Sequence, residues 1–348
     1  MSAAADSKRS ASFRQSTALA ILKQNGLNIF LAIIALVFIG FAITTHNYLT
    51  LFNIKTIVRD AALVGIMGIG LTFVTLSGNF FLLSMKETAA LCIITFATSM
   101  SHDYGFIISL VGALAVAMVS GGLQGLLIGR GGNPIVVTLG AAGILYGIAS
   151  WWSDNLVISF RRPNDAEWLG TGSVMGIPNI TITFIVIAIL AELVLRKTSF
   201  GRQVYLIGAN RAAGKATGHE NRSMAIKVCM IASVCCAIVA VAFSAQMSSA
   251  QANYFSSEFG SSGDFTILVI ATVMVAGNSI MGGYGSTLRT SLGAVFISAV
   301  DNMMVLQGYN SGPRVLSVGL MIVFSLSLIH ISEPTRLLSI SYAVFCLK

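Results

Sequence analysis

Long uninterrupted apolar runs are the feature of this sequence that most restricts its fold. About 20 apolar residues are enough to cross the hydrocarbon core of a membrane as a helix. The strands of a membrane β-barrel would alternate apolar and polar residues, which these runs do not. The sequence therefore predicts an all-α, polytopic transmembrane helical bundle. Its ten candidate spans lie at roughly 28–45, 54–77, 80–100, 106–128, 133–153, 180–195, 227–251, 265–281, 288–306 and 315–329.

The low charge content excludes most other classes of protein. Only 10% of the 348 residues are charged and 55% are hydrophobic, whereas a soluble domain carries about 25% charged residues. This excludes an ordinary cytosolic enzyme, a disordered chain and a coiled coil. The cysteines lie in or beside apolar runs without a CxxC pair, so we expect buried hydrophobic residues, not a metal site or a disulfide framework. They are Cys92, Cys229, Cys235, Cys236 and Cys346.

The distribution of charge predicts the orientation of the spans. Residues 196–227 hold seven Lys and Arg against the single acid Glu220, and such basic loops collect on the cytoplasmic side. Residues 154–179 and 252–264 hold acids in excess, so we expect them outside. Six runs precede the basic loop, and six is even, so the N-terminus is predicted to be cytoplasmic. The basic tail 1–27 favours the same side.

Two Gly-Asn pairs do not fit a simple series of membrane-spanning helices joined by loops. Only Gly78-Asn79 separates the second run from the third, and Gly277-Asn278, 199 residues later, precedes the glycine-rich stretch Met281 to Ser286. Two residues are too few for two full spans to turn on. Broken or re-entrant helices are therefore predicted here, and irregular backbone at membrane depth lines protein or a water-filled cavity. Paired interruptions of this kind indicate an internal repeat with the solute path at its interface.

Charged and amide side chains inside the apolar runs are the further candidates for that path. Lys86 and Glu87 are adjacent, so on a helix they cannot both face lipid cheaply. They line the path, or they lie near an interface or in a turn and reach water. Asn278, Asp301 and Asn302 are milder candidates, because Asn also serves as hydrogen-bonding glue between helices.

Motifs of enzymes are absent. The sequence holds no HExxH, no GxSxG with its partners and no GxGxxG after a strand. His102-Asp103 could form a catalytic pair, but a short interfacial turn is favoured because no third group at a fixed spacing accompanies it. Gly214-Lys215 resembles part of a phosphate loop, but Gly208 stands one residue too far away and Ala216 replaces the hydroxyl. We therefore expect no ATP hydrolysis by this chain.

The basic loop has a local design of its own. Gly208-Ala209-Asn210 is typical of a turn, since Gly and Asn accept positive φ. Arg211 to Ala216 then predicts a short Ala-rich helix that ends at Thr217-Gly218. Such a helix fits a socket in a partner protein, or it lies on the membrane surface with its cations on anionic lipid. The residues alone leave both interpretations open.

This loop resembles the cytoplasmic coupling loop of bacterial ABC importer permeases of the ribose, xylose, galactose and autoinducer-2 class. The stretch Val275 to Met304 resembles that class's glycine-rich turn and following helix, and Leu71 to Met85 occupies the place of its substrate-path loop. Together the similarity covers about residues 28–329. Phe80 to Leu82 stand where the family usually has an acid, and Lys86-Glu87 where it has small residues. The matching loop residues are Phe200, Gly201, Arg202, Gly208, Ala209, Asn210, Ala212, Ala213 and Gly218.

The resemblance implies the membrane-spanning permease subunit of a binding-protein-dependent importer for a small sugar, in the bacterial inner membrane. It implies three partners: a cytosolic ATP-binding-cassette ATPase that holds ATP and Mg²⁺, a second permease copy or paralogue, and a periplasmic or extracellular solute-binding protein. No enzymatic activity, cofactor, metal site or nucleic-acid partner is expected of this chain. The ATPase is expected to dock on Gly201, Arg202, Gly208, Asn210, Ala212, Ala213 and Gly218. The path residues expected are Gly78, Asn79, Lys86, Glu87, Gly277, Asn278 and Asn302.

Two other functions compete, and one segment stands apart. An ion-coupled secondary transporter would use Asp60, Lys86 and Glu87 as its relay, and an intramembrane enzyme would use His102-Asp103. The sequence divides into a cytoplasmic tail (1–27), a permease domain (28–329) with the coupling loop 196–227, and a C-terminal segment (330–348). The last part, from about Ser327, resembles a translated sequencing-adapter read-through, so a non-native C-terminus is expected.

Overall fold

The computed structural model describes residues 36, 38–161, 166–216, 218, 220–257 and 264–332, the last seven by their backbone only. The expected tail 1–27 and the C-terminal residues 333–348 lie outside the described residues. The chain divides into two units, residues 1–50 and 51–348. In the first unit residues 38–44 are helical, and the rings of Phe38 and Phe41 contact that of Tyr48 in the following turn.

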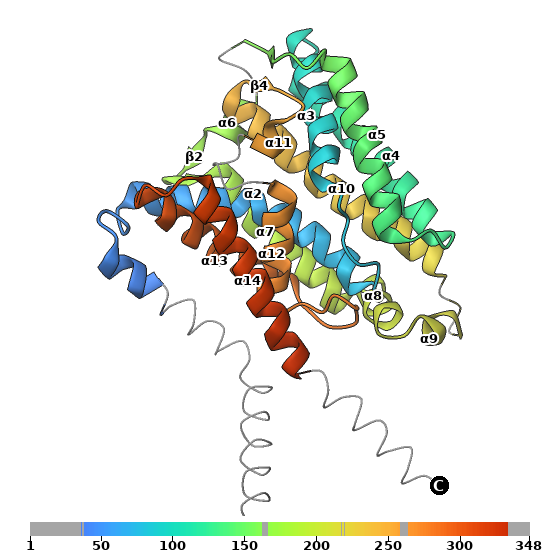
Figure 1. Ribbon diagram of the computed structural model, residues 1–348. Helices are drawn as coiled ribbons and strands as arrows, with labels where there is room; N and C mark the ends of the chain where they lie inside the picture. Colours follow the sequence, from blue (N-terminus) through green and yellow to red (C-terminus); the bar gives the residue numbers. More distant parts are fainter. Residues whose placement is uncertain are drawn as a thin grey trace, which may run out of the picture. The chain divides into compact units, whose positions relative to one another are not determined.

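The second unit, residues 51–348, is a bundle of helices (Figure 1), and its described residues include four very short strands. Its longer helices are α2 (Leu51–Leu76), α3 (Met85–Ser101), α4 (Phe106–Gly129), α5 (Pro134–Ser153), α7 (Asn179–Lys197), α8 (Ser199–Ala209), α10 (Asn221–Met247), α12 (Phe265–Val275), α13 (Thr287–Leu306) and α14 (Ser311–Ser332). Single helical turns form α6 (Glu167–Gly170), α9 (Arg211–Ala216) and α11 (Tyr254–Ser257). Two antiparallel pairs join β1 (Ile158–Ser159) to β4 (Ser249–Ala250) and β2 (Ser173–Val174) to β3 (Ile177–Pro178).

The helices follow the predicted apolar runs from residue 51 onward. Within the described residues, five of them are long and apolar enough to cross a membrane: α2, α4, α5, α7 and α10. Residues 265–275 and 311–325 are shorter apolar helices. The protein is thus a multi-span helical membrane protein, as the sequence predicts.

Several predicted boundaries differ from the helix ends, among them the end of α12, which lies at Val275 and not at 281. The third run was expected to start at residue 80, but residues 77–84 are irregular and α3 begins at Met85. Helix α10 begins at Asn221 and not at 227, because a helix that starts in water needs no apolar residues in its first turn. Helix α14 continues through His330, where the sequence suggested that the last run is cut.

Helix α2 lies at the centre of this unit. Every residue from Ala61 to Ser77 is buried, and α7, α10, α12 and α13 pack around it (Figure 1). Helix α4 packs on α10 through glycines at four-residue spacing. An added Cβ would lie 2.6 Å from the Cys229 carbonyl oxygen at Gly121 and 2.5 Å from the Ile226 Cα at Gly125. Such a small-residue stripe brings helix backbones close together in membranes.

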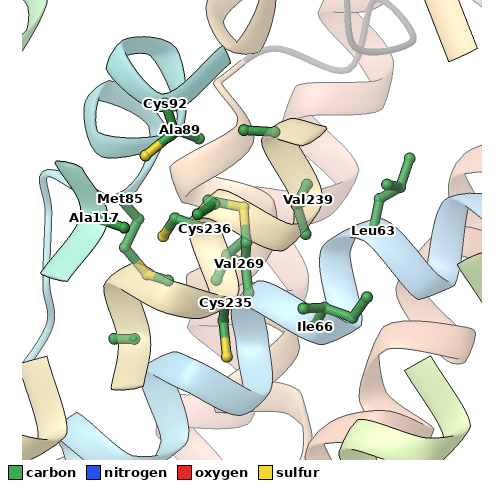
Figure 2. Packing of buried hydrophobic residues seen from close by; sticks show 14 of the residues in the cluster. Leu63, Ile66, Met85, Ala89, Cys92, Ala117, Cys235, Cys236, Val239 and Val269 are labelled. Carbon is green, nitrogen blue, oxygen red and sulfur yellow. The ribbon is translucent and has the colours of Figure 1, made fainter. Parts of the chain in front are cut away.

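The cysteines occupy the core that these helices enclose. Cys92, Cys229, Cys235 and Cys236 are buried and free. Figure 2 shows Cys235 and Cys236 among aliphatic side chains such as Val239 and Val269. The prediction that they act as small hydrophobic residues is confirmed for these four, and Cys346 lies outside the described residues.

Candidate functional site

Both Gly-Asn pairs form the same helix C-terminal cap. After α2, the N–H of Gly78 donates to the Thr75 carbonyl and that of Asn79 to the Val74 carbonyl. After α12, Gly277 and Asn278 donate to the carbonyls of Met274 and Val273 in the same pattern. Gly78 has φ +75° and Gly277 φ +71°, the left-handed conformation that this type of cap requires. The two Gly-Asn pairs thus end their helices in the same way.

Three stretches of backbone meet at the end of α2. The Leu76 carbonyl accepts a hydrogen bond of 2.9 Å from the N–H of Gly283. A Cβ on Gly282 would lie 2.8 Å from the Gly78 nitrogen and 2.9 Å from the Gly208 Cα. Backbones therefore touch here without intervening side chains. We call this region the junction; it comprises residues 76–79, 205–211 and 278–288.

Gly208 owes its place in the junction to its size. The predicted turn over Gly208-Ala209 is wrong, because both residues lie in the last turn of α8 and only Asn210 is extended. A methyl group on Gly208 would overlap the Leu76 carbonyl and lie 2.6 Å from the Gly283 nitrogen. The glycine is thus required for close approach and not for positive φ.

The short helix α9 confirms the prediction over Arg211 to Ala216. Its N-cap is Asn210, whose side chain accepts hydrogen bonds from the N–H groups of Ala212 and Ala213, at 2.9 and 3.2 Å. Ala212 is exposed and Ala213 half-buried. Gly218 follows with φ +80°. Thr217 lies outside the described residues.

Arg211 ties this helix to α2. Its Nη2 donates to the Gly78 carbonyl oxygen at 2.6 Å and to the Asn79 Oδ1 at 3.1 Å. Asn79 is fully buried and also donates to the Ser77 hydroxyl. A guanidinium that satisfies a cap carbonyl and its neighbouring amide is a charge-assisted link between the basic loop and the first Gly-Asn pair.

Two further residues of the predicted coupling loop, Gly201 and Arg202, lie on α8. Gly201 is buried, and an added Cβ would overlap the Leu195 carbonyl group of α7. Arg202 is exposed. The Tyr205 hydroxyl donates to the Gly285 carbonyl at 2.8 Å. Burial raises the pKa of Tyr205, and the Glu192 carboxylate adds to this, so the phenol stays protonated and able to donate.

Asn278 closes the second Gly-Asn pair against α13. Its side chain accepts from the Ser286 N–H at 2.9 Å and donates to the Thr290 hydroxyl at 2.8 Å. The Thr290 hydroxyl in turn lies 2.7 Å from that of Thr72 in α2. Asn278 is 1% exposed. Its contacts are those of hydrogen-bonding glue between helices, which the sequence left as one of two interpretations.

Glu192 binds the junction from α7 and was not predicted as a site residue. Its carboxylate on α7 accepts hydrogen bonds from the first residues of α13: the hydroxyl of Ser286, both donors of Thr287 and the N–H of Leu288, at 2.7 to 3.2 Å. Arg196 contacts the other side of the carboxylate. A negative charge at a helix N-terminus is stabilising. The signal was available, because Glu192 is a lone acid inside an apolar run.

Lys86 and Glu87 lie in a different place, at the N-terminus of α3. The Lys86 ammonium contacts the Asp264 carboxylate and lies 3.7 Å from Glu87 Oε1. Asp264 also caps α12, since its Oδ1 accepts from the Thr266 N–H at 2.9 Å. Asp264 was expected in an outer loop and was not predicted as a site residue. The structure thus places Gly78, Asn79 and Asn278 in the junction, with Gly277 directly before it, and puts Lys86 and Glu87 in this separate ion-paired group.

The other candidates are placed elsewhere. Asp60 lies beside Arg59 and within electrostatic range of Asp301 and Arg314. No interaction among the described residues joins it to the Lys86 group. Arg314 binds both carboxylate oxygens of Asp301. Asn302 follows on α13, 15 residues beyond Thr287, which is about 22 Å along the helix.

The pair His102-Asp103 is exposed in the turn after α3, with Asp103 at φ +57°. The ring of His102 lies against that of Tyr104. These positions are those of an interfacial turn, the simpler of the two interpretations.

Comparison with known proteins finds related sequences over most of the chain. The family model described as the permease component of a branched-chain amino acid transport system matches residues 53–326. The probable ABC transporter permease protein YphD of Escherichia coli K12 is 28% identical over 294 residues, which is 84% of this chain and 86% of that protein.

Two further relatives carry more specific names. The ribose import permease protein RbsC of Haemophilus influenzae is 28% identical over 84% of this chain and 90% of its own length. The autoinducer 2 import system permease protein LsrC of an Enterobacter species is 27% identical over 82% of this chain and 81% of its own length. No solved structure matches the chain.

Proposed function

This chain belongs to the family of permease components described as a branched-chain amino acid transport system, and from that premise we propose that it carries a small sugar or similar polyol across the membrane. The resemblance predicted from the sequence is confirmed. The protein is a multi-pass, non-catalytic membrane subunit of a bacterial ABC importer. The solute class is supported by relatives named for ribose and autoinducer 2 import.

The junction supports a coupling role for the basic loop. The face of α9 that carries Ala212 is exposed, while its first residue, Arg211, holds the cap of α2. A cytosolic ATPase that docks on α9 would therefore pull directly on a helix end. The observation that carries the proposal is this contact between Arg211 and Gly78, because it links the expected docking residues to the expected path.

The same contact suggests how alternating access is produced. Closure of the ATPases on ATP moves α8 and α9, and the junction passes this motion to the ends of α2 and α12 and to the start of α13. The helices that end or begin at these positions, where the backbone is broken, then change their direction around the path. The subunit acts by differing in solute affinity between its two facing states, and no covalent step takes place in it.

The proposal includes a topology of ten spans with the N-terminus in the cytoplasm. Lys and Arg gather in the basic loop between α7 and α10, which favours a cytoplasmic junction. The strands β1 to β4 and α6 would then lie outside, where a solute-binding protein delivers its cargo. A second permease copy or paralogue would complete the path, and ATP with Mg²⁺ would reside in the ATPase subunits.

Reconstitution with the ATPase encoded nearby tests this function. The complex is expected to form and to drive uptake of radiolabelled D-ribose, used as the probe, only with ATP and a solute-binding protein. Replacing Ala212 and Ala213 by Trp is expected to abolish both complex formation and uptake. Ser223→Trp, at an exposed position in the first turn of α10, is the control and is expected to retain both.

An opposite result would favour the competing function. Uptake driven by a proton gradient in the absence of any ATPase would contradict the importer and favour an ion-coupled transporter centred on Lys86 and Glu87. The separation of Asp60 from these residues already divides the relay that such a transporter would need.

A further inference from the structure

Lys86, Glu87 and Asp264 form a charged group between two helix N-termini, here named the charged triad. Lys86 contacts Asp264 and lies 3.7 Å from Glu87 Oε1. Lys86 and Glu87 stand in the first turn of α3, and Asp264 caps α12. The ion pair joins residues 178 positions apart in the sequence. It therefore connects the helix that follows the first Gly-Asn pair to the helix that precedes the second.

Helix lengths place the charged triad at about half the depth of the membrane. The junction holds the charged basic loop, so it lies at a membrane surface. Helix α12 ends at this level, because the Gly283 N–H in its following loop donates to Leu76 at the end of α2. With 11 residues, α12 reaches only about 16 Å back from the junction, whereas the hydrocarbon core is about 30 Å thick. Asp264, at the far end of α12, thus lies near the middle.

The part of α3 that follows the charged triad is enclosed by protein. Every residue of α3 from Thr88 to Ala97 is buried, so this helix has no lipid-facing side there. The side chains of Lys86, Glu87 and Asp264 nevertheless keep 21%, 12% and 32% of their surface exposed. Partial exposure inside the protein at membrane depth indicates a water-filled space, because charges facing lipid at this depth are costly.

The charged triad holds one more carboxylate than ammonium. One ammonium faces two carboxylates, and Lys86 and Asp264 are the charged groups that act most strongly on Glu87. The Glu87 Oε2 is buried and has no hydrogen-bond partner in the described part of the chain. The same holds for the Nε2 of Gln124, which is 3% exposed and whose Oε1 accepts from Ser84, the residue that precedes α3. Two buried polar groups at the start of α3 thus lack a hydrogen-bond partner among the described residues.

We propose that the charged triad is a solute subsite of the transport path that accepts uncharged or cationic solutes and rejects anionic ones. The inference rests on the proposed function, since it takes the space beside the triad to be the path. A net negative charge in a low-dielectric space repels anions and attracts donors such as hydroxyl and ammonium groups. Glu87 supplies the second carboxylate of the triad. The ion pair of Lys86 with Asp264 holds together the N-termini of α3 and α12 on either side of it.

Charge-selective labelling of a nearby cysteine tests the subsite without knowledge of the solute. Leu83→Cys places a thiol three residues before Lys86, within about 11 Å along the chain. The full-length protein with Cys346→Ser retains only native thiols that are buried. In lipid nanodiscs, three methanethiosulfonate reagents of similar size are compared by mass spectrometry: the cationic ethyltrimethylammonium, the neutral hydroxyethyl and the anionic sulfonatoethyl reagents.

We expect the cationic reagent to react faster than the anionic one by about tenfold more than it does at an exposed reference cysteine. The reference is Leu156→Cys, in the loop after α5, where the leucine is 67% exposed. Glu87→Gln is expected to bring the ratio at position 83 close to the reference value, while Glu87→Asp keeps it high. Neither change is expected to alter the ratio at position 156.

Two results would overturn the subsite. If none of the three reagents reacts at position 83, no water reaches the triad. A cation-to-anion ratio that is the same with Glu87 and with Gln in its place would show that this charge does not act on solutes. The labelling needs neither ATPase nor transported solute, so a failure of ATPase coupling would leave its result unchanged. The two proposals therefore fail separately.

Discussion

The guanidinium of Arg211 lies 2.6 Å from the carbonyl oxygen of Gly78. The first residue begins a six-residue helix in the basic loop, and the second caps a 26-residue helix at the centre of the bundle. This contact makes the basic loop part of the transmembrane machinery and not merely an exposed partner surface. It also provides the most direct test of coupling.

Replacing Arg211 by Ala is expected to lower ATP-driven uptake by about tenfold, because a charge-assisted hydrogen bond of this kind contributes about 1.5–3 kcal/mol. Arg211→Lys keeps the charge but lacks the planar fork that reaches both Gly78 and Asn79, so an intermediate rate is expected. Uptake and ATP hydrolysis are measured together in proteoliposomes. Lys197→Ala removes an equal charge at an exposed position and should leave uptake unchanged; equal losses in both variants would argue against a specific link.

Gly208→Ala is expected to destabilise the protein by about 1–3 kcal/mol, since its methyl group has no room beside Leu76 and Gly283. Gly143→Ala in α5 is the matched control, because nothing lies within 4 Å of the Cβ it adds. Removal of a helix-interior glycine there should be neutral or stabilising by about 0.5–1 kcal/mol. Thermal unfolding in detergent compares the two. Equal melting temperatures would contradict the close backbone contact of the junction.

Glu192→Ala is expected to cost about 3 kcal/mol, because it leaves buried donors at the start of α13 without an acceptor. Glu192→Gln keeps one oxygen and should cost less. Glu220→Ala removes an exposed acid that makes no cap hydrogen bond and should stay within about 0.5 kcal/mol. Chemical unfolding followed by Trp fluorescence measures the differences. A Glu192→Ala protein as stable as the Glu220→Ala protein would show that the carboxylate does not hold α13.

Gly78→Ala and Gly277→Ala are expected to destabilise by similar amounts, about 1–2 kcal/mol each, because both residues have φ near +70° in equivalent caps. Asn tolerates this conformation better than Ala, so Gly277→Asn should recover part of the loss. No atom lies within 4 Å of a Cβ at Gly277, so its cost reports backbone strain alone. Melting temperatures of the three variants check this, and an unaffected Gly277→Ala would contradict the cap.

Tyr205→Phe is expected to cost about 1 kcal/mol through the lost hydrogen bond to Gly285. Since the pKa of Tyr205 is raised in the folded protein, mainly by burial, the contribution is complete below the ordinary pKa of 10.0. It is lost as the pH rises through the raised value. The difference in melting temperature between the two proteins should therefore be constant from about pH 6 to 9 and shrink above about pH 10. If the difference in melting temperature shrank at low pH instead, the stabilisation would come from a group other than the Tyr205 hydroxyl.

The local features of the fold were readable from residues close together in the sequence. Continuous hydropathy located α2, α4, α5 and α7 within a few residues, and α10 except for its first turns. The Ala-rich composition between two predicted turns located α9, because short helices depend on neighbouring side chains. The Gly-Asn pairs marked two helix ends, since glycine best suits the conformation that this cap requires.

Features that depend on long-range contact were not readable in this way. Gly208 looked like a turn residue, but its lack of a side chain serves the contact with Leu76, more than 130 residues earlier. Asp264 looked like a member of an outer loop, but the structure pairs it with Lys86. Glu192 was passed over although its charge within an apolar run was itself a signal.

The sequence by itself determined that this is a helical membrane protein, where most of its helices lie and which residues break them, because hydropathy and backbone preference act over a few neighbouring residues. Only the tertiary structure decided that the basic loop touches both helix ends at the junction and that the charged triad lies apart from it. Hydrogen bonds and ion pairs between distant segments, such as those of Arg211 with Gly78 and Lys86 with Asp264, leave no period or spacing in the chain. They arise when the packing of the helices brings their ends together.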